Sequence, residues 1–512
     1  MMSFHRAYLA PSAVGLSLFA TTAYADLTAA DVWGNWRSYM EGMGYSVTAT
    51  EATSGDTLTV GDITVQINGG PEIASIAMRT GSIDFVETGD GAVSIVMPES
   101  MPMVIDVTPS GTESPARIAL TYTQSGQSMI ASGDPDAVAY TQSSDRFGIS
   151  LSGLEVDGTT FDENAARFSL TGTDITSLTK VSVGETRVYD QDISIGTTTY
   201  DLFFKSPDGV EAMKLNANFQ DMTFTGTSAL PKDGITQMQS LAPMLAAGFA
   251  FDGTFTTKAT ETKMELTSED GVNKIKSGSA SSNATVAMGT EGMTYDVGMT
   301  GVQIGAEIAG VPFPLFAEMA QSGFKLHAPL SESDAPQDFS FGFDMTEFTM
   351  SDIIWALFDP SGQLPRDPAT IALDLSGKAK ILSDFLDPEK MEQLALSGET
   401  PAELHAVKID RLTVDAVGAK IDATGDVTFD NTDTTTLPGF PKPVGDIKID
   451  IAGANGLIEK LQTMGLLPAE QVMGARMMMG LFAVAGDSPD TLKSKIEFTD
   501  AGQILANGQR LK

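Results

Sequence analysis

The chain has 512 residues, of which 42% are hydrophobic and 19% are charged, so its composition is that of a globular protein and not of a disordered one. Lys and Arg number 31 against 67 Asp and Glu, and the net charge of -36 argues against nucleic acid as a partner because such a surface repels phosphates. The absence of cysteine excludes a disulfide, a thiol nucleophile and a lipid-modified cysteine.

The amino terminus predicts a secretory signal peptide. Arg6 precedes a mostly apolar run, residues 7–20, that is too short to span a bilayer, and the small residues Ala23 and Ala25 frame a cleavage site. We expect cleavage after Ala25 and export to the periplasm, with an extracellular location as the alternative. The mature chain then starts at Asp26. No later apolar run is long enough for a transmembrane anchor.

A helix is predicted directly after the cleavage site, in TAADVWGNWRSYMEGMGY. Thr28 and Asp31 have the spacing of a capping box, and Gly44 is placed to end the helix. Its apolar face consists of Val32, Trp33, Trp36, Met40 and Met43. This face either contacts a ligand or a membrane interface, or clamps the helix over one end of a sheet. The second interpretation is the simpler one.

Alternating apolar and polar residues predict strands over most of residues 45–224. In TLTVGDITVQI the alternation changes phase at Gly61 and Asp62, which predicts a bulge or a turn. The GDG at residues 89–91 predicts a hairpin. Few long helical patterns occur in this part of the chain, which therefore favours long antiparallel sheets.

Short helices are predicted between the strands of the second half. One runs from Ile235 to Leu245 and ends at Gly248, and another, SDIIWALF, covers residues 351–358. Each lies beside a strand with an apolar face that the helix can cover.

The stretch GDIKIDIAGANGLIEKLQTMGLLP changes its period in the middle. Alternating isoleucines predict a strand that ends near Gly453, and a helix follows at once, with Asn455 placed to cap it and Gly465 to end it. The apolar face of this helix consists of Leu457, Ile458, Leu461 and Met464. These four residues are our candidate binding site, because they either cover the sheet as ordinary core or line an open groove for an apolar ligand.

The predicted fold is mainly β, of the α+β class, with long curved antiparallel sheets and a few short amphipathic helices that cover or line them. We divide the chain into the signal peptide, residues 1–25, an N-terminal β-rich region, residues 26–230, and a C-terminal β-rich region with short helices, residues 231–512.

Segments spread along the chain carry a resemblance to a known family. They are DVWGNWRSYMEGMGY, GDGAVSIVMP, LFDPSGQLPRDPATIALDLSG, and VGAKIDATGDVTFD through LANGQRL. Together they resemble domain of unknown function family 2125, found in exported proteins of alphaproteobacteria, which has no assigned activity. More loosely, the strand and short-helix units are similar to AsmA-like envelope proteins. That resemblance implies long curved sheets with apolar grooves associated with lipid handling, and it concerns the fold more than the function.

The sequence offers little catalytic chemistry. After the signal peptide only His327 and His405 remain, each in a strand-like run, and neither a G-x-S-x-G elbow nor a P-loop occurs. The acidic clusters at residues 132–136 and 430–436 lack the spacing of a calcium loop and are explained as turns. A Ser–Lys pair or a carboxylate pair stays open. We expect a protein that is not an enzyme and holds no metal or cofactor.

Three functions from different classes fit these observations. We favour a non-enzymatic envelope protein that binds an apolar ligand such as lipid in a sheet groove. The 26 methionines favour it, because flexible thioethers suit adaptable apolar surfaces. The alternatives are a structural or interaction module with an envelope protein as partner, and a hydrolase with an atypical site.

Overall fold

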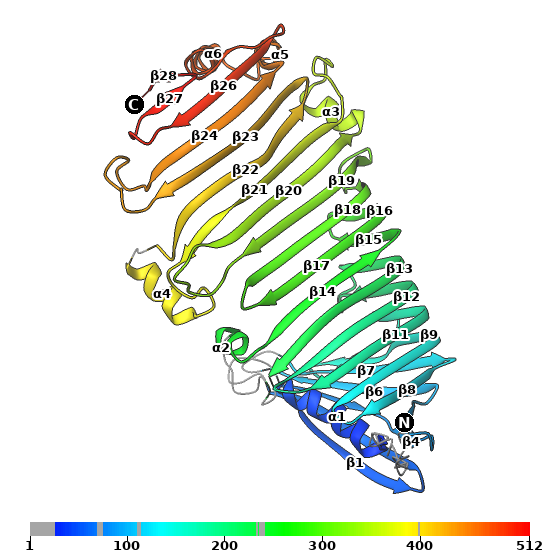
Figure 1. The fold of residues 1–512 in the computed structure, drawn as a ribbon. Helices are drawn as coiled ribbons and strands as arrows, with labels where there is room; N and C mark the ends of the chain where they lie inside the picture. Colours follow the sequence, from blue (N-terminus) through cyan, green and yellow to red (C-terminus); the bar gives the residue numbers. More distant parts are fainter. Residues whose placement is uncertain are drawn as a thin grey trace, which may run out of the picture.

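The computed structural model describes residues 26–68, 75–109, 114–231, 234, 241–397 and 400–511, and over these the chain forms one large antiparallel sheet (Figure 1). The protein is 62% strand and 13% helix, so the predicted mainly β fold with a few short helices is confirmed. The helices are α1 (Ala29–Gly42), α2 (Leu241–Ala246), α3 (Asp352–Phe358), α4 (Pro388–Ser397), α5 (Ala454–Thr463) and α6 (Ala469–Phe482).

Each strand pairs with strands close to it in the chain. The strands of the first half are β1 (Ser46–Ser54), β2 (Thr57–Asn68), β3 (Ser75–Thr80), β4 (Ile83–Glu87), β5 (Val93–Val96), β6 (Ser100–Thr108), β7 (Ala116–Ser125), β8 (Ser128–Asp134), β9 (Ala137–Val156), β10 (Thr159–Phe161), β11 (Ala166–Val183), β12 (Thr186–Lys205) and β13 (Ala212–Pro231). At several positions in the sheet, two short strands pair one after the other along the length of a single long strand. Thus β3 and β4 both pair with β2, and β7 and β8 both pair with β9.

The sheet continues without a break past residue 230, because β13 pairs with both β14 and β15. The later strands are β14 (Ala250–Thr257), β15 (Thr260–Ser268), β16 (Gly271–Ser279), β17 (Ser281–Gly289), β18 (Gly292–Glu307), β19 (Leu315–Ala328), β20 (Gln337–Met350), β21 (Ala369–Ile381), β22 (Ala402–Ala416), β23 (Ala419–Asp430), β24 (Lys442–Ala452), β25 (Val484–Ala485), β26 (Thr491–Phe498), β27 (Ile504–Ala506) and β28 (Gln509–Arg510).

Several local predictions are confirmed. The hairpin at residues 89–91 joins β4 to β5, and the helix expected at residues 351–358 is α3. Asp62 has a φ of 48° and lies opposite a register shift in β1, so the phase change in β2 is a bulge. Residues 235–240 of another expected helix lie outside the described residues, and α2 follows them.

The long strands change the phase of their alternation where a residue has positive φ. Asp174 in β11 and Asp221 in β13, with φ values of 54° and 49°, lie on either side of Gly196 in β12. The buried residues of β11 are even-numbered before Asp174 and odd-numbered after it: Ala166 and Gly172, then Ile175 and Val181. Such bulges bend the strands and keep the less exposed side chains on one face of the sheet.

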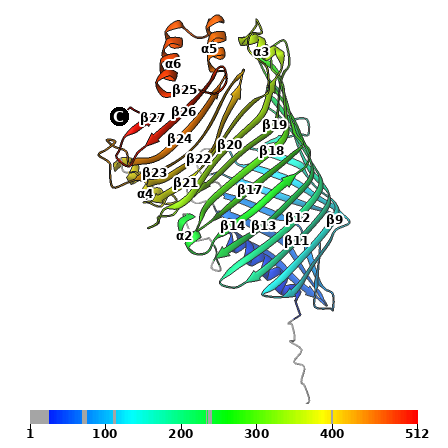
Figure 2. The ribbon, with the colours of Figure 1, turned by 45° about the horizontal axis from the view of Figure 1, so that its top comes forward.

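Helix α1 closes the amino-terminal end of this face. The predicted capping box of Thr28 and Asp31 is present, and Trp33, 3% exposed, packs in the main hydrophobic core with side chains from strands as far apart as β2 and β13. Contact of one short helix with so many strands requires the sheet to curl around it, and Figure 2 shows this curvature. The clamp predicted for the tryptophan face is therefore part of the fold.

Beyond α1 the same face of the sheet stays apolar. Residues directly opposite each other in neighbouring strands point to the same side, and from β17 to β21 one such row consists of Val286, Tyr295, Leu326, Phe341 and Leu375. The opposite face is polar. There Arg411 of β22 pairs with Asp374 and Asp344 of the two preceding strands, each at 2.8 Å. The sheet is thus amphipathic over its length, and we call its apolar side the apolar face.

Helices α5 and α6 lie at the carboxyl-terminal end of the sheet (Figure 2), where α5 contacts β23 and α6 contacts β26. Ser494 of β26 lies opposite Ile449 of β24 and donates a hydrogen bond of 2.6 Å to the carbonyl oxygen of Phe482 at the end of α6. Helix α6 therefore returns to the apolar face at this end.

Candidate functional site

The middle of the apolar face exposes large side chains. Phe255 of β14 is 46% exposed, Tyr295 of β18 is 40% exposed and Phe343 of β20 is 39% exposed. Val297, Phe324 and Phe343 lie opposite one another in successive strands, so these exposed side chains belong to one continuous surface. Exposure of such a surface to water is unfavourable, which makes the apolar face a candidate binding surface.

The four candidate residues lie together on or beside α5. Leu457, Ile458 and Leu461 are within the helix, Met464 follows its last residue, and all four are half-buried. They lie at the carboxyl-terminal end of the sheet, where α5 contacts β23 and α6, and not in the exposed middle of the apolar face.

The start of α5 differs from the prediction. Gly453 is its N-terminal cap residue, and Asn455 lies inside the first turn, so Asn455 is not the cap. The carboxylate of Asp490 accepts hydrogen bonds from the backbone N–H groups of Asn455 and Gly456 at 3.0 and 2.9 Å. The cap comes from a loop later in the chain because Gly453 has no side chain to supply one.

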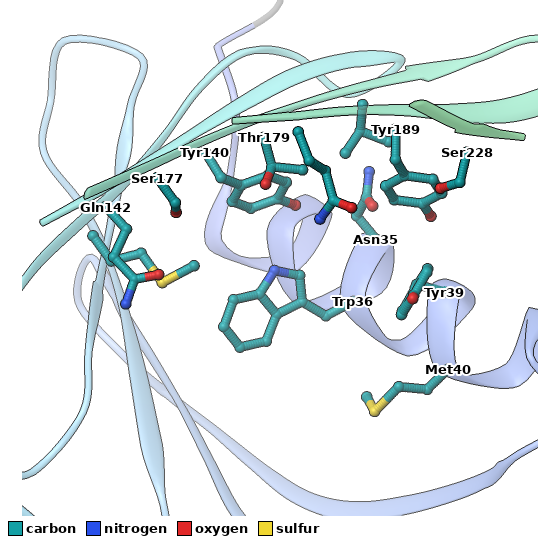
Figure 3. A pocket seen from close by; sticks show the side chains of 13 residues that line it. Asn35, Trp36, Tyr39, Met40, Tyr140, Gln142, Ser177, Thr179, Tyr189 and Ser228 are labelled. Atoms are coloured by element: carbon teal, nitrogen blue, oxygen red, sulfur yellow. The ribbon is translucent and has the colours of Figure 1, made fainter. Parts of the chain in front are cut away.

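A cavity of about 410 Å³ lies between α1 and the curled sheet. Asn35, Trp36, Tyr39 and Met40 of α1 form one wall, and side chains of β8, β9, β11, β12 and β13 form the other. Figure 3 shows the two walls facing each other, with the Trp36 ring standing between the helix and the strands. This volume lies within the range of small-ligand sites.

Two phenols of the strand wall are buried beside polar groups, the indole of Trp36 near Tyr140 and the guanidinium of Arg187 near Tyr189. Tyr140 and Tyr189 are each 6% exposed, and neither hydroxyl makes a hydrogen bond of normal geometry to any described residue. Burial raises the pKa of both tyrosines, and the nearby Arg187 only partly opposes this at Tyr189. Both phenols therefore stay protonated at neutral pH, and each can donate a hydrogen bond.

Only part of this cavity is predictable from the sequence. Trp36 and Met40 were predicted as members of the apolar helix face, whereas Tyr140, Tyr189 and Ser228 were not singled out. They lie in three different strands, and only the register of the sheet brings them opposite α1. The available signal was a tyrosine in each of two strands whose same-face neighbours are glutamines.

The weak catalytic and metal-binding candidates of the sequence are the two histidines and the acidic clusters. In the part of the chain that the structure describes, they do not form a metal site. His327 of β19 shares a hydrogen bond of 3.0 Å with Thr294, and His405 lies on β22 at 3.6 Å from Glu403. In the cluster at residues 430–436, Asp433 accepts hydrogen bonds from the backbone N–H groups of Thr435 and Thr436, as in a turn. Within the described ranges, no group of three or more His, Asp or Glu side chains is placed to hold a metal ion.

Comparison of the chain with protein-family models, with curated proteins and with solved structures finds no match. None of the helices in the described part of the chain combines the length and the apolar character that crossing a bilayer requires.

Proposed function

We propose that this is a non-enzymatic protein of the cell envelope that binds the acyl chains of lipid on the apolar face. The observation that carries the proposal is the continuity of this face. Opposing apolar residues run across successive strands, while Phe255, Tyr295 and Phe343 remain exposed. A bound chain would remove this surface from water, which stabilises the complex by about 0.8 kcal/mol for each CH₂ group buried.

The dimensions of the face support an acyl chain as the occupant. From β13 through β14 and β17 to β22 the sheet has consecutive strand pairings. Seven such spacings of about 4.8 Å extend over about 34 Å. One leaflet of a bilayer has a hydrocarbon depth of about 15 Å, so an extended chain fits along this part of the face.

The charge of the chain argues against an anionic occupant. The polar face carries ion pairs, such as Lys378 with Asp338 at 2.6 Å and Lys214 with Glu265 at 2.9 Å, and its charged side chains are solvated. Because the net charge is -36, an anionic macromolecule would be repelled.

The test is to purify the protein without detergent, extract it with organic solvent and analyse the extract by mass spectrometry. We expect lipid in the extract, and less of it from Phe343→Asp, which places a charge on the apolar face. Ser340→Asp is the matched control, because Ser340 lies on the same strand and pairs with Ser376 in the polar alternation. Stable protein that carries no lipid and takes up no added phospholipid would end the proposal and favour a structural or interaction module.

We also propose that the chain works in the periplasm after removal of its signal peptide. The apolar run before Ala25 supports this, and membership of domain of unknown function family 2125 likewise stays a prediction. Intact mass measurement of periplasmic protein should give a chain that starts at Asp26. A mature species that retains Met1 would contradict the location.

A further inference from the structure

We infer that the cavity under α1 binds the uncharged, hydroxyl-bearing head of the lipid whose acyl chains follow the apolar face. This inference rests on the proposed function and adds the chemical class and orientation of the ligand. It places the head at the amino-terminal end of the sheet and the chains toward β20.

The strand register places the cavity next to the apolar face, on the same side of the sheet. Gln191 of β12 lies opposite Thr179 of β11. Two residues further along β12, Ile193 lies between Ser177 of β11 and Phe224 of β13. Phe224 in turn contacts Phe255, with ring centroids 4.5 Å apart. Within two strands the lining changes from amides and hydroxyls to phenylalanines, as an amphiphile requires.

The same change from polar to apolar side chains occurs in the row of opposing residues that starts at Tyr189. Tyr189 lies opposite Ser228, and Ser228 lies opposite Phe251 of β14. Phe251 is followed in the register by Met288 and Met293. A molecule with its head against Tyr189 therefore finds only apolar side chains along these next strands.

The polar groups of the cavity are those that bind hydroxyl groups. The buried hydroxyls of Tyr140 and Tyr189 have only poorly aligned neighbours, Trp36 and Arg187 respectively, and a ligand that completes their hydrogen bonding is favourable. Gln142 and Gln191 add amide donors and acceptors on the same wall. The rings of Trp36 and Tyr39 supply the flat apolar surface against which the C–H face of a sugar or glycerol packs.

The head is assigned as uncharged because the described lining of the cavity contains no Asp, Glu, Lys or Arg. A cation, Arg187, lies beside Tyr189 but outside the lining, and its Nη1 makes no hydrogen bond of normal geometry to the described residues. A phosphate would have to be neutralised by this one side chain against the net charge of -36. Glycosyl and glyceryl heads share the required chemistry.

The test uses short-chain ligands that dissolve as monomers, titrated into lipid-free protein and followed by calorimetry. Octyl glucoside and dioctanoylglycerol represent the two hydroxyl-bearing heads. Methyl octanoate lacks a hydroxyl, and dioctanoyl phosphatidylglycerol is anionic. We expect octyl glucoside, dioctanoylglycerol or both to bind at least tenfold more tightly than methyl octanoate and the anionic lipid.

The double variant Tyr140→Phe, Tyr189→Phe removes both hydroxyls and keeps both rings. We expect it to lose at least tenfold in affinity for the preferred hydroxyl-bearing ligand, with no loss for methyl octanoate. It should melt at the same temperature as the parent or higher, because unpaired buried hydroxyls are removed. Tyr122→Phe, on β7 and outside the cavity, is the matched control and should leave all affinities unchanged.

The outcomes separate the two proposals. Phe255→Asp, two strand spacings from Tyr189 and within reach of an eight-carbon chain, should weaken all four ligands, whereas the tyrosine variant should weaken only the hydroxyl-bearing ones. Equal binding of methyl octanoate and octyl glucoside, with no effect of the tyrosine variant, would overturn the head site and leave the acyl-chain site standing. Preference for phosphatidylglycerol that Arg187→Gln abolishes would overturn the uncharged assignment. Absence of binding by all four ligands would overturn both proposals.

Discussion

The carboxylate of Asp490 accepts hydrogen bonds from the backbone N–H and the side-chain amide of Asn455, at 3.0 and 2.9 Å, across 35 residues of the chain. Gly456 donates a third hydrogen bond, of 2.9 Å, to the same carboxylate. The loop before β26 therefore holds the first turn of α5 and fixes this helix to the sheet.

Replacement of Asp490 by Ala should destabilise the protein by roughly 1–2 kcal/mol, the usual effect of losing a helix cap. The free energy of unfolding from urea titration measures this. Asp490→Asn keeps one acceptor and should cost less. Equal stability of Asp490→Ala and the parent would show that water replaces the carboxylate without loss.

The contribution of Asp490 should depend on pH. Burial acts to raise its pKa, but hydrogen bonds from Gly456 and Asn455 outweigh burial, and the pKa lies below its ordinary value. A carboxyl with a depressed folded-state pKa contributes stability above the unfolded-state pKa, about 3.9, and loses it as the pH falls through the folded-state value. The difference in free energy of unfolding between the parent and Asp490→Ala should therefore be largest at neutral pH and shrink below about pH 4.

Gly453→Ala should be more damaging than Gly465→Ala. Both glycines have positive φ, 72° and 74°, so each substitution strains the backbone. A Cβ on Gly453 would also lie 2.1 Å from the carbonyl oxygen of Gly418, whereas a Cβ on Gly465 meets nothing within 4 Å. The difference between the melting temperatures of the two variants measures the effect of the clash, because both variants carry the backbone strain. Equal melting temperatures would mean that the join between β24 and α5 relaxes freely.

Trp33→Ala should cost about 3–5 kcal/mol, because a large buried side chain leaves a cavity. The variant also loses the hydrogen bond of 2.9 Å from the indole N–H to Glu51. Trp36→Ala is the comparison, since Trp36 is only half-buried and lines the cavity. It should cost less stability in urea titration and more ligand affinity in calorimetry. The reverse order would show that Trp36 and not Trp33 fixes α1 to the sheet.

Leu461→Ala tests the role of the apolar side of α5. Because Leu461 is half-buried, we expect a loss of less than about 2 kcal/mol, below the range for fully buried leucines. Bound lipid, measured by solvent extraction, should be unchanged if the chains lie in the middle of the apolar face. A strong loss of lipid with unchanged stability would instead place the ligand against α5.

The sequence predicts those features that depend on neighbours in the chain. The capping box of Thr28 and Asp31 and the bulge at Asp62 are local, and both are confirmed. The phase changes at Asp174 and Asp221 involve no glycine at the kinked residue itself, so a shift of alternation there looks like the end of one strand and the start of another.

The cavity depends on contacts that local patterns do not contain. Trp36 and Ser228 line the same cavity because the strands from β2 to β13 curl around α1, and the curl follows from bulges and strand twist that accumulate over the whole first half. The cap of Asp490 on α5 has the same character. Its partner lies beyond a complete second helix, and nothing near Asn455 in the sequence indicates it.

The pairing order of the sheet has a consequence for how the protein is made. Within the described ranges, no strand pairs with one more than three places away in chain order. Every strand after β1 except β25 has a partner that precedes it in the chain, so assembly can proceed from the amino terminus by successive additions to an existing edge. The same property makes length adjustable. Insertion or removal of one hairpin changes the number of rows without changing how the other rows meet, as repeats do in a solenoid, so the span of the surface can vary while its two ends are kept.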